Sequence, residues 1–408
     1  MKQSIWLIFL ALFISCKQEP TKIYTLQDDV ALLASDSLMG RETGTENELM
    51  AANYLAGRFK GIGLAPAGMA DTYFQTFTFK PKKDPHQEVT YIKAGDSTIT
   101  GTNVIGFIDN KAPNTIILGA HYDHLGMGGE GSLYRGDAAI HNGADDNASG
   151  VAVLLQLAQK LKQSKLIGNN YLIMAFSGEE IGLLGSNYFA KNPTIELENV
   201  NYMINMDMVG RLRDSKVLSV SGTGTSRIWP QVLNANNQDF ELVLKESGVG
   251  PSDHTSFYLQ DIPVLHFFTG QHEDYHKPTD DADKLNYQGM EQITTYIMGV
   301  ITELNDDAKL AFMKTKNESE EVPRFKVAMG VIPDYLFGGK GMRIDGVSEE
   351  KPAQRAGLLK GDVVVQMGDS TVVDMMSYMR ALSAFEEGDS TTVVVDREGK
   401  QISVQIKF

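Results

Sequence analysis

Five groups of histidine, aspartate and glutamate residues occur between residues 121 and 276. They are HYDH at 121–124, ADDN at 144–147, GEE at 178–180, a lone Asp207, and HEDYH at 272–276. One such group alone would be unremarkable, because an Asp before a helix is most often an N-cap. Imidazole and carboxylate together suit zinc, and a carboxylate placed between two ions bridges them in two-metal hydrolases. The set therefore indicates a metal-dependent hydrolase.

Most of these groups directly follow an apolar run of strand type. The runs cover residues 115–120, 171–176, 202–206 and 262–268, and a helical pattern covers residues 148–163. Such alternation predicts an α/β domain with a mostly parallel central sheet that helices cover on both faces. Open α/β sheets bind ligands at the carboxyl ends of their strands, which is where these polar groups fall.

The stretch from His272 to His276 also matches H-E-x-x-H, the zincin motif. That motif works only on a helix, where residues four apart share a face. Here Gly270 and Pro278 flank a strand exit, and a zincin would leave the other carboxylates unexplained. We therefore expect no zincin helix. His276 is a ligand on either interpretation, whereas His272 is expected to be only a nearby polar residue.

The composition limits both the partners and the number of domains. The chain has 408 residues, 42% of them hydrophobic, and a formal net charge of -15. An acidic chain is a poor ligand for nucleic acid, so we expect no nucleic-acid partner.

A charged segment, KTKNESEEVP at 314–323, precedes a compact region with short strand patterns. We expect one domain over residues 27–312, a linker over 313–324, and a smaller α+β domain over 325–408.

The N-terminus reads as a targeting segment. Residues 5–14 are apolar, and Ser15-Cys16 follows in the manner of a bacterial lipobox. This pattern predicts a lipoprotein signal peptide over residues 1–15, lipidation of Cys16, and a polar tether over 16–26. The protein would then be exported and lipid-anchored in the bacterial cell envelope, in the periplasm or at the outer-membrane surface. An ordinary cleaved signal peptide and a core cysteine are the alternatives. With a single cysteine, a disulfide within the chain is excluded.

The ordered motifs AHYDHLG, GADDNASG, FSGEE, NMDMVG and DYHKPTDD resemble those of the co-catalytic zinc aminopeptidases. The same superfamily contains glutamate carboxypeptidase II and the glutaminyl cyclases, and the resemblance covers residues 25–310. It implies a zinc exopeptidase fold that binds two zinc ions. The ligands it implies are His121 and Asp207 for one ion, Glu180 and His276 for the other, and Asp145 as the bridge.

The resemblance also implies roles for the neighbouring residues. Glu179 would be the general base, and Tyr275 would donate a hydrogen bond to the oxyanion. Asp123 and Asp280 would orient His121 and His276 respectively. Asp146 would lie beside the ligands, after a peptide bond to Asp145 that is often cis in this family. Ser252-Asp253-His254 would line the site.

The function that this set implies is an exported zinc-dependent exopeptidase. We expect an aminopeptidase that removes N-terminal residues from peptides through a zinc-activated water. A carboxypeptidase or dipeptidase of the same family shares the motifs. A glutaminyl-peptide cyclotransferase is a further alternative, although cyclases usually bind one zinc and lack the full ligand set. A peptide-binding protein with a vestigial peptidase domain is less compatible with an intact set.

The C-terminal region resembles a bacterial PDZ domain. The resemblance rests on GMRIDGV at 341–347 and on AGLLKGD at 356–362. PDZ domains add a peptide strand to a sheet edge and grip its terminal carboxylate with backbone N–H groups. The gripping loop is expected at Met329, Gly330 and Val331. Capture of a C-terminal peptide ligand and a purely structural appendage both remain open.

Overall fold

The computed structural model describes residues 24–81, 90–92, 95, 97–129, 131–316, 326–334, 336–348 and 350–408. Cys16 and the apolar run before it lie outside these residues, as does most of the expected linker over 313–324. In this part of the chain, no helix combines the length and the apolar character that crossing a bilayer requires.

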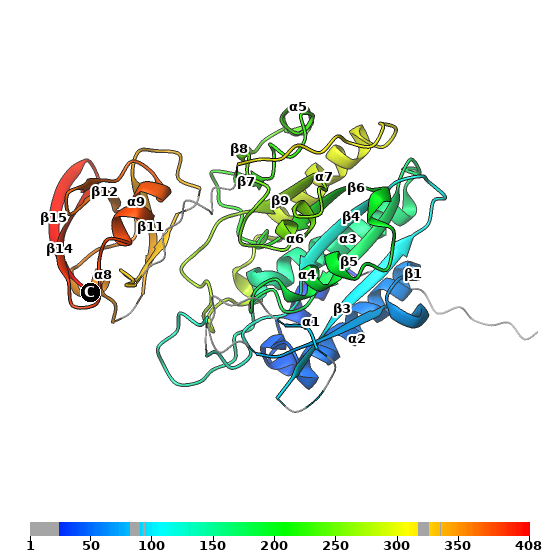
Figure 1. Ribbon diagram of the computed structural model, residues 1–408, viewed down its shortest axis with the longest axis horizontal. Helices are drawn as coiled ribbons and strands as arrows, with labels where there is room; N and C mark the ends of the chain where they lie inside the picture. Colours follow the sequence, from blue (N-terminus) through cyan, green and yellow to red (C-terminus); the bar gives the residue numbers. More distant parts are fainter. Residues whose placement is uncertain are drawn as a thin grey trace, which may run out of the picture.

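Among the described residues, nine strands form one sheet in the order β1-β3-β5-β4-β6-β9-β7-β8, with β2 beside β3 (Figure 1). The strands are β1 (Ala65–Pro66), β2 (Phe74–Phe79), β3 (Ile99–Ile108), β4 (Thr115–His121), β5 (Asn170–Phe176), β6 (Val200–Met206), β7 (Val217–Ser221), β8 (Glu241–Lys245) and β9 (Val264–Phe268). The central strands β5, β4, β6 and β9 run parallel to one another. Their carboxyl ends therefore meet at one edge of the sheet, while β3 and β7 join the parallel centre in antiparallel fashion.

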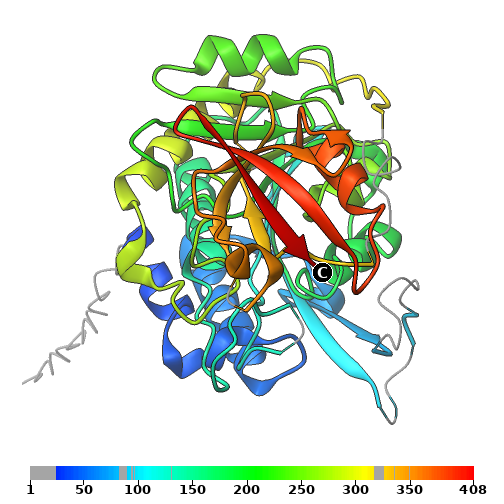
Figure 2. The same ribbon diagram turned by 90° about the vertical axis from the view of Figure 1, so that its left-hand side faces the viewer.

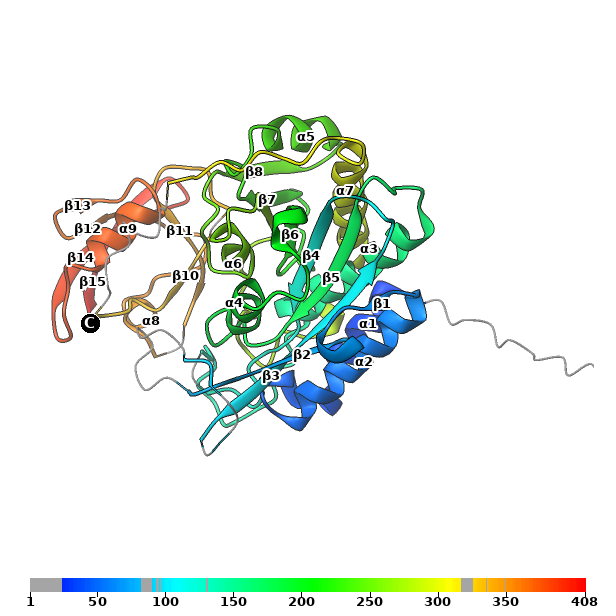
Figure 3. The same cartoon turned by 45° about the vertical axis from the view of Figure 1, so that its right-hand side comes forward.

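Helices cover both faces of this sheet (Figure 3). One face carries α1 (Leu26–Leu33), α2 (Glu46–Ile62), α3 (Gly150–Gln163) and α7 (Tyr287–Glu303), and the other carries α4 (Leu184–Lys191) and α6 (His254–Tyr258), with α5 (Trp229–Asn236) packed on α7. The short turns are η1 (Asp36–Arg41), η2 (Met69–Asp71), η3 (Ala144–Ser149), η4 (Leu197–Asn199) and η5 (Ala282–Lys284).

The central strands are buried along their whole length, as parallel strands covered on both faces should be. Neighbouring residues of β4 enter different cores: Leu118 packs with α3, and Ile117 packs with Phe189 and Phe257 on the opposite side. The α/β architecture predicted from the strand and helix patterns is therefore confirmed. The predicted helix begins two residues later than expected, because residues 144–149 form the separate wide turn η3.

The C-terminal unit has its own sheet, in which the described part of the chain forms six strands in the order β10-β11-β12-β14-β15 with β13 beside β12. The elements are β10 (Val331–Pro333), β11 (Met342–Val347), α8 (Pro352–Arg355), β12 (Val363–Met367), β13 (Ser370–Thr371), α9 (Met375–Leu382), β14 (Ser390–Arg397) and β15 (Lys400–Lys407). Its core is separate from that of the larger unit and includes Ile344, Val364 and Val393. Figure 2 shows this unit in front of the nine-stranded sheet.

The two units meet at Arg213, in the loop between β6 and β7. Its guanidinium donates to the carbonyl oxygen of Gln271 at 2.9 Å and to the carboxylate of Asp345 in β11. It also lies 3.5 Å from Asp334, directly after β10. The C-terminal unit is thereby tied to the loop that follows β9, which leads to Tyr275 and His276.

Candidate metal centre

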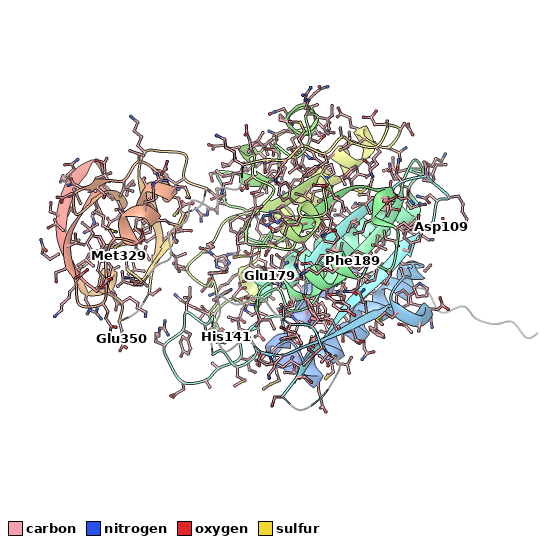
Figure 4. All side chains as sticks on the ribbon, viewed as in Figure 1. Asp109, His141, Glu179, Phe189, Met329 and Glu350 are labelled. Carbon is pink, nitrogen blue, oxygen red and sulfur yellow. The ribbon has the colours of Figure 1, made fainter. Side chains whose placement is uncertain are left out.

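The parallel strands deliver the predicted site residues to one edge of the sheet. His121 ends β4, Glu179 and Glu180 follow β5, and Asp207 follows β6 directly. His276 lies in the turn after β9, where the backbone has a φ of +54°. Figure 4 shows Glu179 on the side of the sheet that faces the C-terminal unit. The prediction that these residues follow the carboxyl ends of strands is therefore confirmed.

Two groups of metal-binding side chains share the carboxylate of Asp146. Its Oδ1 lies 3.3 Å from Nε2 of His121, and its Oδ2 lies 3.2 Å from Nε2 of His276. On one side, Nε2 of His121 is also 3.4 Å from Oδ1 of Asp207. On the other, Nε2 of His276 is 3.2 Å from Oε2 of Glu180. Asp146 thus stands between two pairs of ligand atoms.

These separations fit zinc. Two donors at roughly 2.0–2.1 Å from a tetrahedral ion lie roughly 3.4 Å apart, close to the distances seen on both sides of Asp146. The side chains are the imidazoles and carboxylates that zinc accepts, and none of them is more than 14% exposed. Electrostatics favour a cation as well. Burial opposes protonation of His276, but Glu180 and Asp146 outweigh it and raise its pKa to about 11.

The prediction that Asp145 lies between the two ligand pairs is wrong, because the next residue, Asp146, has that position. Oδ1 of Asp145 accepts hydrogen bonds from the backbone N–H of Gly210 at 2.6 Å and from the hydroxyl of Ser149 at 3.0 Å. Its Oδ2 lies 3.1 Å from Nε2 of His272. These contacts turn Asp145 away from the two ligand pairs and leave the bridging position to Asp146. The cis peptide bond is likewise shifted, to Asp146–Asn147.

Of the two carboxylates predicted to orient the histidine ligands, only one contacts its histidine. Oδ1 of Asp123 lies 3.6 Å from Nδ1 of His121, as predicted. Asp280, however, does not contact His276. Its Oδ2 accepts from the backbone N–H groups of Asp145 and Asp146, at 2.9 and 3.1 Å, and so holds the bridging turn. Nδ1 of His276 instead lies 2.8 Å from the carbonyl oxygen of Gly131. The loop carbonyl therefore orients this imidazole.

The HEDYH segment is not a zincin helix. Residues 273–276 form turns, and the N–H of Tyr275 donates to the carbonyl of His272 at 3.0 Å. His272 contacts Asp145 rather than the residues around Asp146. The prediction that this segment is not a zincin helix is therefore confirmed. The prediction that His272 is only a nearby polar residue is also confirmed.

Sequence reasoning missed His124. Its Nδ1 lies 2.6 Å from Oε1 of Glu180, and it forms a second cluster of metal-binding atoms with Asp146 and Glu180. At hydrogen-bond distance, its direct effect is to orient Glu180. The signal was present in the sequence, since His124 follows Asp123 directly in the HYDH group.

Arg41 was also missed, because nothing in its local sequence marks it. The side chain is buried and donates to the carbonyl oxygens of Tyr122, Asn142 and Gly143, at 2.7, 2.6 and 3.1 Å. It thereby ties the loop after β4, which carries Asp123, to the residues directly before η3, the turn that contains Asp146. Ser252 of the expected Ser-Asp-His element has a defined contact too, since its hydroxyl donates to Oδ2 of Asp207 at 2.6 Å.

A cavity of about 310 Å³ opens onto the bridging carboxylate. Its lining combines the metal-binding side chains with the predicted catalytic residues and a second set from the neighbouring strands. The lining residues are Asp146, Glu179, Glu180, Asp207, Met208, Ser219, Ser221, Lys245, Pro251, His266, Phe268, Gln271, Tyr275 and His276. Burial, reinforced by Asp207 and Glu180, raises the pKa of Glu179 well above its usual value. The ring of Tyr275 stacks on His276 at a centroid distance of 3.8 Å.

The predicted gripping loop lies at the start of β10. Val331 begins the strand, and Gly330 has a φ of +80°. The carbonyl oxygens of Met329 and Gly330 accept from Ala353 and Ser348. The strand pairs with β11 on one side, and Met329 is buried in the core of this unit (Figure 4).

Residues 103–301 match peptidase family M28, and residues 298–408 match the PDZ domain family. The chain is 30% identical over 248 residues to the uncharacterized protein YfbL of Escherichia coli, which covers 52% of this chain and 73% of that protein. It is 27% identical over 219 residues to the aminopeptidase YwaD of Bacillus subtilis, which covers 50% of this chain and 45% of that protein.

Solved structures share the fold at low identity. A zinc aminopeptidase from Bacillus subtilis superposes with a TM-score of 0.54 at 18% identity, over 73% of this chain and 99% of that one. A glutaminyl cyclase from Porphyromonas gingivalis superposes with a TM-score of 0.52 at 20% identity, over 68% of this chain and 98% of that one. Both a peptidase and a cyclase therefore use this architecture.

Proposed function

The chain belongs to peptidase family M28 and carries a PDZ domain, and from this premise we propose that it is an aminopeptidase with two zinc ions. The observation that carries the proposal is the carboxylate of Asp146, which stands between two pairs of ligand atoms in a cavity that Glu179 also lines. The aminopeptidase YwaD and the zinc aminopeptidase of Bacillus subtilis support it.

The metal would be held by one pair of ligands on each side of Asp146. His121 and Asp207 form the first pair, and Glu180 and His276 form the second. Zinc bound there supplies a Lewis acid that polarises the scissile carbonyl and makes water a better nucleophile. The protein's own residues supply proton transfer and orientation.

Glu179 takes a proton from the attacking water and later delivers it to the leaving amine. Its buried position suits this task, because burial raises the pKa of the carboxyl and lets it hold a proton between the two transfers. Tyr275 lines the same cavity, and its hydroxyl would donate to the oxyanion that forms when water attacks. His124 and Ser252 fix the positions of Glu180 and Asp207.

The test compares Glu179→Gln with the wild type and with Glu291→Gln, a control on the exposed surface of α7. Metal analysis should find two zinc ions in all three proteins. Turnover of leucine p-nitroanilide should fall by about 10²–10⁴ in Glu179→Gln alone, which is the usual contribution of a general base. Normal turnover in Glu179→Gln would contradict the mechanism.

A substrate panel separates aminopeptidase activity from its alternatives. Aminoacyl anilides, N-acetylated peptides and peptides with N-terminal glutamine are offered to the same preparation. Release of aniline supports the proposal. Cleavage of N-acetylated peptides alone would replace it with a carboxypeptidase, and cyclisation of glutamine with a single bound zinc would replace it with the cyclase function.

We also propose that the protein is exported and anchored by lipid on Cys16. The support is the apolar run of residues 5–14 directly before Ser15-Cys16. Wild-type protein should partition into the detergent phase of a cell-envelope extract, and Cys16→Ser should move to the aqueous phase. Equal partitioning of the two proteins would refute lipidation.

A further inference from the structure

One wall of the catalytic cavity is formed by a single face of β7, β8 and β9. Ser219 and Ser221 of β7 pair with Phe268 and His266 of β9, and Ser221 also pairs with Lys245 of β8. Directly paired residues project from the same face of a sheet. All five side chains line the cavity. The backbone register therefore sets the composition of this wall.

The alternate residues of the same strands point the other way. Val220 and Phe267 are fully buried in the core that contains α3 and α7. The strands thus separate an apolar face from a face that carries two hydroxyls, an imidazole and an ammonium group beside the ring of Phe268. An aliphatic guest is disfavoured here, because each hydroxyl covered without a hydrogen-bond partner costs free energy. This wall is instead suited to a polar guest.

Lys245 supplies the positive charge of the wall. Among the described residues that line the cavity, it is the single lysine or arginine. His266 does not add to that charge, since burial lowers its pKa to about 4, with a further contribution from Lys245. The imidazole is therefore neutral near pH 7. The other charged side chains of the lining belong to the metal-binding cluster and to Glu179, which are occupied by the reaction itself.

We propose that Lys245, together with the hydroxyls of Ser219 and Ser221, forms a carboxylate-binding subsite of the peptidase. The inference deepens the proposed function and rests on it. In an aminopeptidase, the carboxylate is the side chain of an N-terminal glutamate or aspartate. If the enzyme instead removes C-terminal residues, the α-carboxylate of the released residue makes the same contacts. Ammonium and hydroxyl donors to a carboxylate are charge-assisted hydrogen bonds, which are stronger than neutral ones.

The experiment measures kcat/KM of the zinc-loaded full chain on glutamyl, glutaminyl and leucyl p-nitroanilides. Glutamate and glutamine have the same shape, so their ratio reports the charge alone. We expect wild type to prefer glutamyl over glutaminyl substrate about ten-fold or more. Lys245→Met should bring that ratio to about one. Lys216→Met is the matched control, because Lys216 pairs with Asp239 on the surface before β7 and should keep the wild-type ratio.

A second pair of variants guards against misfolding. Ser221→Ala removes one hydroxyl without a change of charge and should lower the ratio less than Lys245→Met does. Lys245→Glu should reverse the preference, so that a lysyl anilide becomes a better substrate than a glutamyl one. An unchanged ratio in Lys245→Met and Ser221→Ala would overturn the subsite, while continued hydrolysis of all anilides would leave the aminopeptidase function standing.

A different result is expected if the aminopeptidase function is wrong but the subsite is correct. If anilides are inert but N-acetylated dipeptides with a free C-terminus are cleaved, Lys245→Met should raise the KM of those peptides about ten-fold. The subsite would then stand and the aminopeptidase function would fall. If nothing is turned over, calorimetry with L-glutamate and L-glutamine decides. Binding of either amino acid that Lys245→Met weakens about ten-fold or more supports the subsite, and binding that Lys245→Met leaves unchanged overturns it.

Discussion

Nε2 of His272 lies 3.1 Å from Oδ2 of Asp145, and this contact occupies two residues that stand beside the metal-binding motifs. The pair lies behind the bridging turn, where Asp280 also faces His272 at 4.0 Å. The neighbouring Asp146 is directed to the other side, between His121 and His276. Adjacent carboxylates therefore have separate tasks: Asp145 supports the turn, and Asp146 joins the two groups of metal-binding atoms.

Asp146→Asn should consequently affect zinc binding, whereas Asp145→Asn should affect the stability of the fold. Asp146→Asn removes the carboxylate that both groups share, so zinc retained after dialysis should fall on both sides. Asp145→Asn should keep the wild-type zinc content but lower the free energy of unfolding by about 1–3 kcal/mol, because buried partners lose a charged acceptor. Metal analysis and urea denaturation of the same preparations check both. Equal zinc loss in the two variants would show that the assignment of the bridge is wrong.

His124→Gln tests the histidine that sequence reasoning missed. Because His124 lies 2.6 Å from Glu180, its loss should weaken zinc binding about 10–100-fold, as is typical when a side chain that orients a ligand is removed. His141→Gln is the control, since His141 contacts Ser132 and the carbonyl of Ala139 instead. Competition with a chelating dye measures the affinity. Equal affinities for the two variants would exclude this orienting role.

The pH dependence of stability should reveal His266. Burial lowers its pKa from 6.5 to about 4, so the folded protein disfavours the protonated ring. The stabilisation is complete above pH 6.5 and is lost as the pH falls towards 4. Between pH 7 and pH 5 the loss should be about 2 kcal/mol.

His266→Phe keeps a ring that stacks on His254, which lies at a centroid distance of 4.6 Å, and it removes the titration. The variant should lose about 2 kcal/mol less than wild type over the same pH range. Denaturant unfolding with a chelator present at every pH checks this, because metal loss on acidification then contributes to neither protein. Parallel curves for the two proteins would contradict the assignment.

The contact between Arg213 and Asp345 should control the docking of the PDZ domain. Arg213→Asp and Asp345→Arg each place like charges together, so each should increase the radius of gyration measured by small-angle X-ray scattering. The double variant restores opposite charges and should return to the wild-type value. Arg397→Ala, which affects a contact with Asp362 inside the PDZ domain, is the control. A compact Arg213→Asp variant would mean that other contacts hold the two units together.

The fold class, the strand ends that carry the site and most of its residues could be predicted from the amino-acid sequence. Apolar runs and the polar groups that follow them are local features, and parallel strands must bring their carboxyl ends to one edge. The short strand patterns after the charged segment likewise indicated a second set of strands, which the structure has as a separate sheet that includes β11, β12, β14 and β15.

Which of two adjacent aspartates lies between the two groups of candidate ligands follows only from the tertiary structure. Asp145 and Asp146 have the same chemistry, and their directions depend on Gly210, His272 and Asp280, which are distant in sequence. The wall of Ser219, Ser221 and Lys245 likewise depends on strand register rather than on local pattern. Arg41 has its role only because the fold brings the carbonyl oxygens of Tyr122 and Asn142 to its side chain. The metal-binding motifs are local sequence patterns, whereas the proposed carboxylate subsite depends on which strands lie side by side.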